Sequence, residues 1–455
     1  MRKRILLAML MIAAIVLSTS CSLIVKDATV DAQTVIIEVA GKSITKAEVQ
    51  SATQNTLSYQ QYMYSMYGLS YDPTNAATIS AAQDSAIEAL IQAAVINQKI
   101  TEGGFDVFTE EELASIEESA KTTYQQNADY IQSLDFADTQ LTGDELEQAV
   151  AQALTAYGYQ DVDSLIASEE YTASQEKLKA SVVQDVTVTA EELQTAYDEN
   201  VASAKSSYES SLAQYGTDVS YGYTIYYHPA GYRYVKNILR KFSDEDTAAI
   251  SDLTSQVSAK QTAIADNAAS LAELAEDASA DTAEQAADRA ALTAAAATLE
   301  AELVELNTAL ADAKAKAVTA LTPTVEEIVG KLAEGEDFDK LMADYGEDTG
   351  MQSEPAMTTG YLVCQGSTQW VSEFTEASMA LAKIGDVSAP FETQYGIHIV
   401  KYVSDLAEGA VPLAQVEETL TQELLSSKQD TRYQETLAQW VDTAEAKVYL
   451  DRMAD

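Results

Sequence analysis

Residues 373–402, EFTEASMALAKIGDVSAPFETQYGIHIVKY, are the stretch that decides the fold. Residues 374–381 have the apolar spacing of a short amphipathic helix, and Gly385 is suited to ending it. Residues 387–390 end in a proline, which favours an extended backbone just before it. Apolar residues then alternate along 396–403, as they do in a strand. The stretch therefore predicts a helix, an extended connection and a strand.

The predicted strand has two distinct faces. Ile397 and Ile399 fall on one face, and His398 and Val400 fall on the other, because successive side chains of a strand point in opposite directions. A single histidine among apolar neighbours is commonly a hydrogen-bonded core residue. The alternative is a functional side chain at a groove, and the alternation by itself leaves both interpretations open.

The whole string resembles the C-terminal half of a parvulin-type peptidyl-prolyl isomerase domain. That family has the pattern F-x-x-A-s-x-A-L, then G-x-V-S-x-P, then T-x-x-G-x-H-I-v. The matching positions are Phe374, Ala377, Ala380, Leu381, Gly385, Val387, Ser388, Pro390, Thr393, Gly396, His398 and Ile399. The resemblance implies a small antiparallel sheet with helices, and a groove that contains His398.

Composition sets limits on the rest of the chain. A length of 455 residues exceeds one ordinary core, so we expect two or three domains. The formal charge of −45 argues against nucleic acid and anionic membrane surfaces as electrostatic partners. His228 and His398 are the only histidines, which excludes a histidine-rich metal site. Cys21 and Cys364 are too few for a disulfide framework or a four-cysteine zinc site. We predict no metal.

The N-terminus predicts a targeting segment over residues 1–20. Residues 2–4 are basic, residues 5–17 are apolar but short for a bilayer span, and residues 18–20 are small. A small-residue run that ends in Cys21 resembles the lipobox of bacterial lipoproteins. The resemblance implies a lipid anchor at Cys21 on the extracytoplasmic face of the bacterial cell membrane. The alternative is an ordinary secretory signal followed by an unmodified cysteine.

Residues 21–33 predict a tether, and the string VIIEVAGKSITKAEV at 35–49 predicts a strand, a turn and a helix. Thr45 and Glu48 form a capping box at the start of that helix. The string resembles the opening of the PrsA- and SurA-like foldases. Residues 34–216 are accordingly expected to form a mostly helical chaperone domain.

Tyrosine and methionine are concentrated between residues 57 and 71. Methionine is adaptable and tyrosine carries a large amphipathic surface, so such a cluster could hold varied unfolded chains. The alternative is that these side chains pack in the core between helices. The residues are Tyr59, Tyr62, Met63, Tyr64, Met66, Tyr67 and Tyr71.

Residues 231–242, GYRYVKNILRKF, resemble the first strand of a parvulin domain, whose usual form is v-x-H-I-L-v-k. Asn237 occupies the position of the first histidine of the family. Val235, Asn237 and Leu239 share one strand face, so Asn237 is expected to point into the same groove as His398.

Residues 243–321 read as an insertion within a parvulin domain that spans 220–403. Apolar residues recur there every seven positions, and a turn is expected at 277–282. The pattern predicts an antiparallel coiled-coil hairpin about 50 Å long at about 1.5 Å per residue. We interpret it as a spacer or contact arm without chemistry of its own. A less favoured alternative is an adhesion or assembly protein that works through this arm.

The parvulin pattern resumes at Pro323. Residues 345–348 resemble the family's Y-S-x-D, which places Asp348 at the position of the catalytic acid or thiol. Residues 404–455 return to a helical pattern, expected to pack back on the N-terminal domain. The predicted fold class is therefore α+β: a helical chaperone domain completed by C-terminal helices, plus a parvulin domain with an inserted coiled-coil hairpin.

The resemblance implies an isomerase that needs no cofactor. Rotation about an X-Pro bond crosses a barrier of about 20 kcal/mol that arises from amide resonance. The proline ring would bind against Trp370, Phe374 and Leu362. The catalytic network would consist of His398, Asp348, Asn237 and Thr393.

The implied substrates are unfolded or newly secreted polypeptides that contain X-Pro bonds, and a homodimer is left open. Because Asn237 replaces a family histidine, the alternative function is a catalytically weak or inactive holdase with the parvulin fold.

Overall fold

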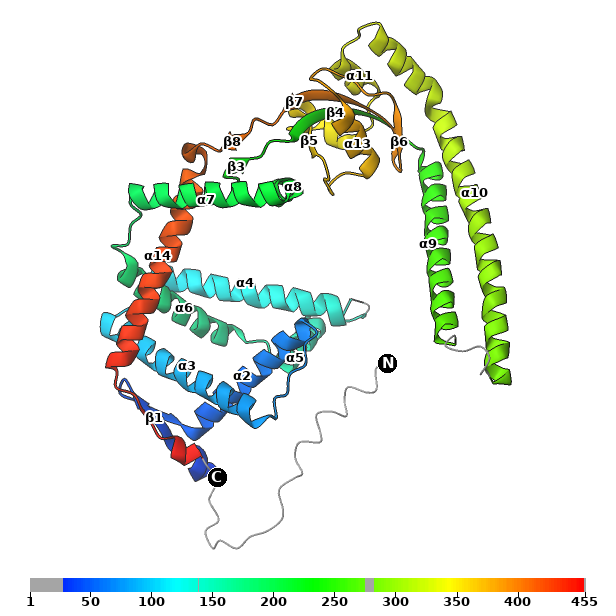
Figure 1. Cartoon of the computed structure of the whole chain (residues 1–455). Helices are drawn as coiled ribbons and strands as arrows, with labels where there is room; N and C mark the ends of the chain where they lie inside the picture. The colour runs from blue at the N-terminus through cyan, green and yellow to red at the C-terminus, as the bar shows by residue number, and fades with distance from the viewer. Residues whose placement is uncertain (1–27, 138, 275–281, 454–455) are drawn as a thin grey trace. The chain divides into compact units, whose positions relative to one another are not determined.

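The computed structural model describes residues 28–137, 139–274 and 282–453, which divide into two compact units. The first unit contains the chain up to Thr187 together with the chain from Leu424 onward, and the second contains Val188–Glu423 (Figure 1). The predicted signal peptide, Cys21 and most of the predicted turn at 277–282 lie outside the described residues. Across the described ranges, none of the helices has the length and apolar character that a membrane span requires.

The first unit is helical with one small sheet. Its sheet has the strand order β2-β1-β9, and both pairings are antiparallel. The elements are α1 (Ala28–Ala32), β1 (Val35–Val39), β2 (Lys42–Thr45), α2 (Lys46–Met66), α3 (Ala76–Gly103), α4 (Glu110–Asp135), α5 (Asp144–Tyr157), α6 (Val162–Val183), most of α14 (Leu413–Thr443), β9 (Lys447–Val448) and a 3₁₀ turn, η2 (Leu450–Met453).

Local sequence signals begin and end these helices. At the start of α2, the Thr45 amide donates to Glu48 Oε2 (2.7 Å), and the Glu48 amide donates back to Thr45 Oγ1 (3.4 Å). This is the predicted capping box, and Thr109 makes an equivalent one at α4. Gly104 ends α3 in the left-handed conformation that glycine adopts without penalty.

The C-terminal segment from Leu424 onward completes the core of the first unit, whereas residues 404–423, which were also expected to pack there, belong to the second unit. Trp440 and Val441 of α14 pack against a buried cluster formed by β1, β2, α2 and α3. The tail then adds β9, in which Val448 pairs with Ile37 of β1. This two-residue strand was not predicted, because its side chains are exposed and show no period. The buried cluster consists of Ile36, Ile37, Val39, Ile44, Val49, Ile87, Ile91, Ala94 and Val95.

The second unit is built on a four-stranded antiparallel sheet of order β5-β4-β7-β6, with a separate β3-β8 pair. Together with the helical first unit, this sheet confirms the predicted α+β class. The elements are α7 (Ala190–Ser210), α8 (Leu212–Tyr221), β3 (Tyr227–His228), β4 (Tyr232–Lys241), α9 (Asp244–Glu273), α10 (Ala283–Ala333), α11 (Phe338–Tyr345), η1 (Thr349–Gln352), α12 (Ala356–Thr359), β5 (Tyr361–Cys364), α13 (Ser372–Ala380), β6 (Phe391–Thr393), β7 (Gly396–Asp405), β8 (Gly409–Ala410) and the start of α14.

The boundary of this unit differs from the sequence-based one. Residue 216, where the helical domain was expected to end, lies inside α8. Both α7 and α8 fall in the second unit, where Tyr208 and Tyr215 pack against Tyr232 of β4. The long helical run therefore contributes to both units.

Both faces of the four-stranded sheet are covered. On one face, Ile238 and Ile399 pack against Ile328 of α10 and Leu341 of α11. On the other face, Val400 packs against Phe374 of α13. Since β4 and β7 run antiparallel, with Leu239 opposite His398 and Asn237 opposite Val400, the two polar side chains lie diagonally on the α13 face.

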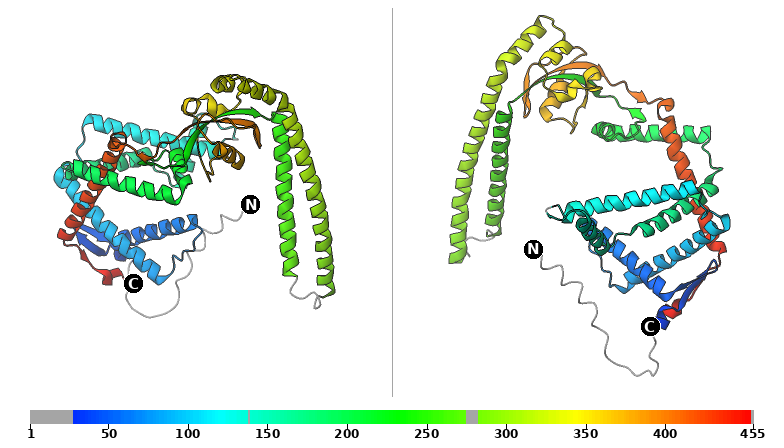
Figure 2. Two further views of the ribbon diagram at one scale, coloured as in Figure 1. Left: turned by 45° about the horizontal axis from the view of Figure 1, so that its top comes forward. Right: turned by 180° about the vertical axis from the view of Figure 1, so that it is seen from behind.

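The predicted coiled-coil arm is present as two helices that lie side by side, α9 and α10 (Figure 2). The helix α10 is 51 residues long and runs through Pro323 without ending, so the second arm helix continues into the helical segment that packs on the sheet. At the base of the arm, Phe242 packs against Ile250 and Ala317. The two ends of the arm therefore lie close together at its base, as expected.

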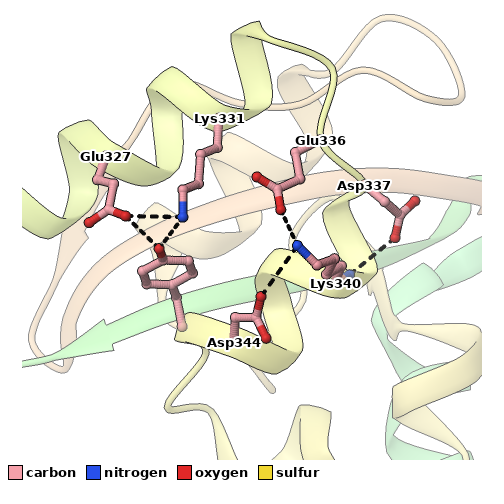
Figure 3. A network of polar contacts seen from close by, with 7 residues as sticks. Glu327, Lys331, Glu336, Asp337, Lys340 and Asp344 are labelled. Atoms are coloured by element: carbon pink, nitrogen blue, oxygen red, sulfur yellow. Dashed lines mark hydrogen bonds and ion pairs between the residues drawn. The ribbon is translucent and has the colours of Figure 1, made fainter.

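Polar contacts join the end of α10 to α11 (Figure 3). The Tyr345 hydroxyl donates to Glu327 Oε1 (2.6 Å) and accepts a hydrogen bond from Lys331. Lys340 of α11 pairs with Glu336 and Asp344 on the same surface. These contacts are largely exposed and individually weak. Their structural consequence is that Tyr345, three residues before Asp348, is attached to α10.

Candidate active site

A cavity of about 340 Å³ opens on the α13 face of the sheet. It lies over β4 and β7 and is bordered by β5, by α13 and by the loop that contains Asp348. The lining residues are Asn237, Leu239, Lys241, Asp348, Tyr361, Gln369, Trp370, Val371, Phe374, Tyr395 and His398.

The four residues predicted for the catalytic network form one hydrogen-bonded chain. Asn237 Nδ2 lies 2.7 Å from Asp348 Oδ2, and Asn237 Oδ1 lies 3.1 Å from His398 Nδ1. The other ring nitrogen, Nε2, lies 2.9 Å from Thr393 Oγ1. These four residues come from β4, the loop after α11, β7 and β6, so the sheet brings together positions that are far apart in the sequence.

The direction of every hydrogen bond in this chain follows from Asp348. An ionised carboxylate can only accept, so the Asn237 amide must direct its NH₂ group toward Asp348 and its oxygen toward His398. His398 Nδ1 must then carry the proton and donate. That leaves Nε2 as an acceptor, and the Thr393 hydroxyl donates to it. The Thr393 oxygen accepts in turn from the Tyr395 amide (3.1 Å).

Burial keeps His398 neutral. The side chain is 5% exposed, the Phe391 ring stacks on it with centroids 5.4 Å apart, and Phe374 contacts it edge-on at 5.7 Å. Loss of hydration lowers the pKa of His398 to about 4, although the nearby charge of Asp348 acts in the opposite direction. The imidazole is therefore uncharged at neutral pH, which agrees with the single tautomer that Asp348 imposes through Asn237.

Backbone contacts with β4 hold Asp348 in place. The Glu347 amide donates to the Leu239 carbonyl (2.9 Å), and the Lys241 amide donates to Glu347 Oε2 (2.8 Å). Arg240 donates to the Tyr345 carbonyl (2.7 Å). These contacts attach the segment before Asp348 to the edge of the groove. Sequence reasoning did not identify Glu347 or Arg240, since only the fold makes them neighbours.

Aromatic rings form the apolar wall. Trp370 lies with its ring centroid 5.5 Å from that of Phe374, and both side chains line the cavity. The Trp370 indole N–H donates to the Leu362 carbonyl (3.0 Å), which fixes the ring. Trp370 and Phe374 therefore form an apolar surface on which an apolar ring could bind.

Leu362 does not line the cavity, which corrects the prediction. Its side chain packs on the opposite face of β5, in the cluster of Tyr208, Tyr215 and Tyr232. Tyr361, its neighbour, lines the cavity instead. The reason is the period of two in a strand, so that a one-residue difference in register exchanges the faces. The prediction rested on resemblance alone, which did not specify that register.

The Tyr/Met cluster of the first unit is mainly exposed. The side chains of Tyr59, Tyr62, Met66 and Tyr67 are between 60% and 73% exposed, on the C-terminal half of α2 and just beyond it. The alternative that these four pack in a core is therefore wrong. They form a second candidate functional surface, which consists of exposed side chains on a helix and not of a cavity.

Two family models match parts of the chain. Residues 303–404 match the PPIC-type PPIASE domain, and residues 1–139 match the SurA-like N-terminal domain. The first match begins within α10, so β4 and the first arm helix precede it.

Similar proteins include foldases and a chaperone. Foldase protein PrsA from Geobacillus sp. (strain WCH70) is 41% identical over 107 residues, which cover 24% of this chain and 36% of the relative. Foldase protein PrsA 3 from Bacillus anthracis is 35% identical over 117 residues, or 26% and 38% of the two chains. Chaperone SurA from Pseudomonas putida is 30% identical over 126 residues, or 28% and 27%. The aligned regions thus span less than two-fifths of these relatives.

Several solved structures align with much of this chain. Peptidylprolyl isomerase (PrsA) from Bacillus anthracis aligns over 80% of this chain and 98% of its own, with 13% identity and a TM-score of 0.19. A SurA-like chaperone from Campylobacter jejuni aligns over 75% and 96%, with 14% identity and a TM-score of 0.25. TM-scores this low do not support a conclusion about function.

Proposed function

From the premise that this chain combines a PPIC-type PPIase domain with a SurA-like N-terminal domain, we propose that it is an extracytoplasmic foldase. Its groove would catalyse cis–trans isomerisation of X-Pro bonds in unfolded or newly secreted polypeptides. The observation that carries the proposal is the directed network of Asp348, Asn237, His398 and Thr393 beside an aromatic wall.

The geometry suits a reaction without a covalent step. In the twisted transition state the amide loses its resonance, and its nitrogen and carbonyl change their charge distribution. The proline ring would rest on Trp370 and Phe374, while the amide faces the polar edge of the cavity. The polar groups there are oriented before the substrate binds, because each one is held by the next. Such preorganised dipoles stabilise developing charge without the cost of reorganisation.

Asn237 can replace a histidine in this network. A neutral imidazole donates from one nitrogen and accepts at the other, and the Asn237 amide likewise donates to Asp348 and accepts from His398. The direction of the chain is therefore retained although the ring is absent. This favours an active isomerase over a parvulin fold that serves only as a scaffold.

A protease-coupled assay with a proline-containing peptide tests the proposal on the full chain. Wild type should raise the rate above the uncatalysed one, and His398→Ala or Asp348→Ala should lower kcat/KM roughly tenfold or more, since about 1.4 kcal/mol is one decade. If wild type shows no rate above the uncatalysed one and Asn237→His does not restore it, the isomerase proposal is wrong.

A holdase function is the second candidate, favoured by the exposed Tyr/Met cluster on α2. It would reside in the helical unit and would not need the groove. A direct comparison is the suppression of aggregation of a reduced model client by wild type, by His398→Ala and by a variant with Tyr59, Tyr62 and Tyr67 changed to Ser. We expect only the last variant to lose suppression. Equal suppression by all three would count against this surface.

We further propose that the protein is lipid-anchored at Cys21. The support is the basic, apolar and small-residue series of residues 1–20 that precedes this cysteine. Cys21→Ala should change both the membrane association and the apparent mass of the protein, because the lipid would be absent and the processing of residues 1–20 would be altered. Unchanged fractionation and mass would rule out the anchor.

A further inference from the structure

We infer that Tyr361 is a positioning residue of the isomerase groove that holds the Asp348 carboxylate in its working orientation; the inference rests on the function proposed above. The Tyr361 hydroxyl donates to Asp348 Oδ1 (2.8 Å), while Asn237 Nδ2 donates to Oδ2 (2.7 Å). The Gly350 amide also donates to Oδ1 (3.0 Å). Both oxygens are thus engaged, and rotation of the carboxylate would break a bond on each side.

The ring of Tyr361 is itself fixed by packing. Its centroid lies 4.4 Å from that of Trp370, with 34° between the planes, and 6.3 Å from that of Phe374. Its backbone is paired with Val235 at the edge of the sheet. The preceding residue, Gly360, has a φ of +89°, and a Cβ there would lie 2.7 Å from the Val235 carbonyl oxygen. A glycine is therefore required for this close approach of β5 to β4.

The loop after Asp348 leaves space for the hydroxyl. A Cβ at Gly350 would overlap the Tyr361 hydroxyl oxygen, so the missing side chain is what lets the phenol reach the carboxylate. Burial and the neighbouring carboxylate raise the pKa of Tyr361, which keeps the phenol protonated and able to donate at neutral pH. Gly360 and Gly350 thus leave the space that the Tyr361 side chain needs. The rings of Trp370 and Phe374 hold the Tyr361 ring in place.

This contact orients the entire hydrogen-bond chain. The Asn237 amide takes its direction from Asp348, and the His398 tautomer takes its direction from Asn237. A carboxylate that can rotate still accepts, but it no longer holds Oδ2 at hydrogen-bonding distance from the Asn237 amide, so the amide loses its fixed acceptor. Tyr361 therefore acts on the groove through Asp348, while its ring contributes to the apolar wall. These two roles can be separated by mutation.

The test uses the full chain and the proline-isomerisation assay. Tyr361→Phe removes the hydroxyl and keeps the ring, so we expect kcat to fall roughly tenfold with little change in KM, because a hydrogen bond to a charged group is lost. Tyr361→Leu removes the ring as well, and KM should then also rise. The matched control is Tyr208→Phe, which removes a Tyr–Asp hydrogen bond of 2.9 Å to Asp218, away from the cavity. Its activity should be within twofold of wild type.

A double-mutant cycle distinguishes positioning from a general structural effect. In the Asp348→Ala background, Tyr361→Phe should cause no further loss of kcat and no further drop in the denaturant midpoint, because the acceptor is already gone. Independent losses in the two backgrounds would overturn the inference, as would an unchanged kcat in Tyr361→Phe when wild type is active. If wild type has no isomerase activity, the proposed function fails. The cycle on the denaturant midpoint would still support or refute the Tyr361–Asp348 contact.

Discussion

The groove and the coiled-coil arm belong to the same compact unit but differ greatly in how much they bury. In the sheet, Ile399 is 2% exposed on one face and Val400 is 0% exposed on the other. Among the described residues of the arm, only Ile250 and Ala317 are buried, both at its base. The heptad residues above the base are all partly exposed. In the sheet, both faces are covered, so the side chains are held in fixed positions. In the arm, one narrow contact between α9 and α10 holds the two helices together but leaves their side chains less constrained.

The chemistry of the side chains explains this difference. Full burial of an isoleucine contributes about 1.5–3 kcal/mol, whereas the partly exposed apolar side chains between the two arm helices contribute less, because they remove less apolar surface from water. The arm adds exposed ion pairs such as Lys260–Glu302 (2.6 Å), which typically contribute less than about 1 kcal/mol each. A site that requires fixed donors and acceptors is therefore found in the sheet and not in the arm.

A pair of matched truncations would test this contrast most strongly. Ile399→Ala in the sheet should cost about 4 kcal/mol of unfolding free energy, because it leaves a cavity between the sheet and the helices α10 and α11. Leu299→Ala in the arm should cost less than about 1 kcal/mol, since the site is partly exposed. Denaturant unfolding followed by circular dichroism would measure both. Equal costs would mean that the arm is a core element in its own right.

The pH dependence of stability should also come from the sheet. His398 has an ordinary pKa of 6.5 and a pKa of about 4 in the folded protein, so between these values the unfolded chain binds more protons. Stability is therefore complete above about pH 6.5 and decreases as the pH falls toward 4, by on the order of 3 kcal/mol.

The comparison with His398→Gln isolates this effect. The variant lacks the titrating group, so its unfolding free energy should decrease less between pH 7 and pH 4 than that of wild type. His228, whose pKa is also lowered by burial, is present in both proteins and cancels. Identical pH profiles would show that His398 is not held neutral by burial.

An isosteric change would test the direction of the network. Asn237→Asp keeps the shape of the side chain but places an acceptor against the Asp348 carboxylate, where a donor now lies. We expect kcat/KM to fall roughly 30-fold, or about 2 kcal/mol. Asn237→His can donate and accept like the amide, so its kcat/KM should be equal to that of wild type or higher. Similar losses in both variants would refute the inferred directions.

Deletion of the outer arm should have the smallest effect. The ion pairs Asp246–Lys316 and Lys260–Glu302 set the register of the two helices, so positions 256 and 306 lie opposite each other. Replacing residues 257–305 with a short Gly/Ser linker should leave kcat/KM and the melting temperature nearly unchanged. Removal of 243–321 should lower the melting temperature, because it uncovers Phe242. Loss of activity in the shorter deletion would mean that the arm contributes to catalysis.

Much of the architecture was determined by short-range patterns in the sequence. The capping residues Thr45 and Thr109 begin helices, heptads produced the paired helices α9 and α10, and alternation after Gly396 produced β7. These signals are local, because a cap or a period acts through residues within a few positions of each other. The strand faces of Asn237 and His398 followed from the same alternation.

Other features were decided only by the tertiary structure. The register of β5 against β4 decides that the Tyr361 side chain lines the cavity and that the Leu362 side chain does not. Gly360 permits this register because it can approach Val235 closely. The pairing of β9 with β1 joins segments from opposite ends of the chain. The direction of the Asn237 amide depends on a carboxylate 111 positions away. Each of these is a long-range contact, and no periodicity within a segment encodes which distant residue will lie beside it.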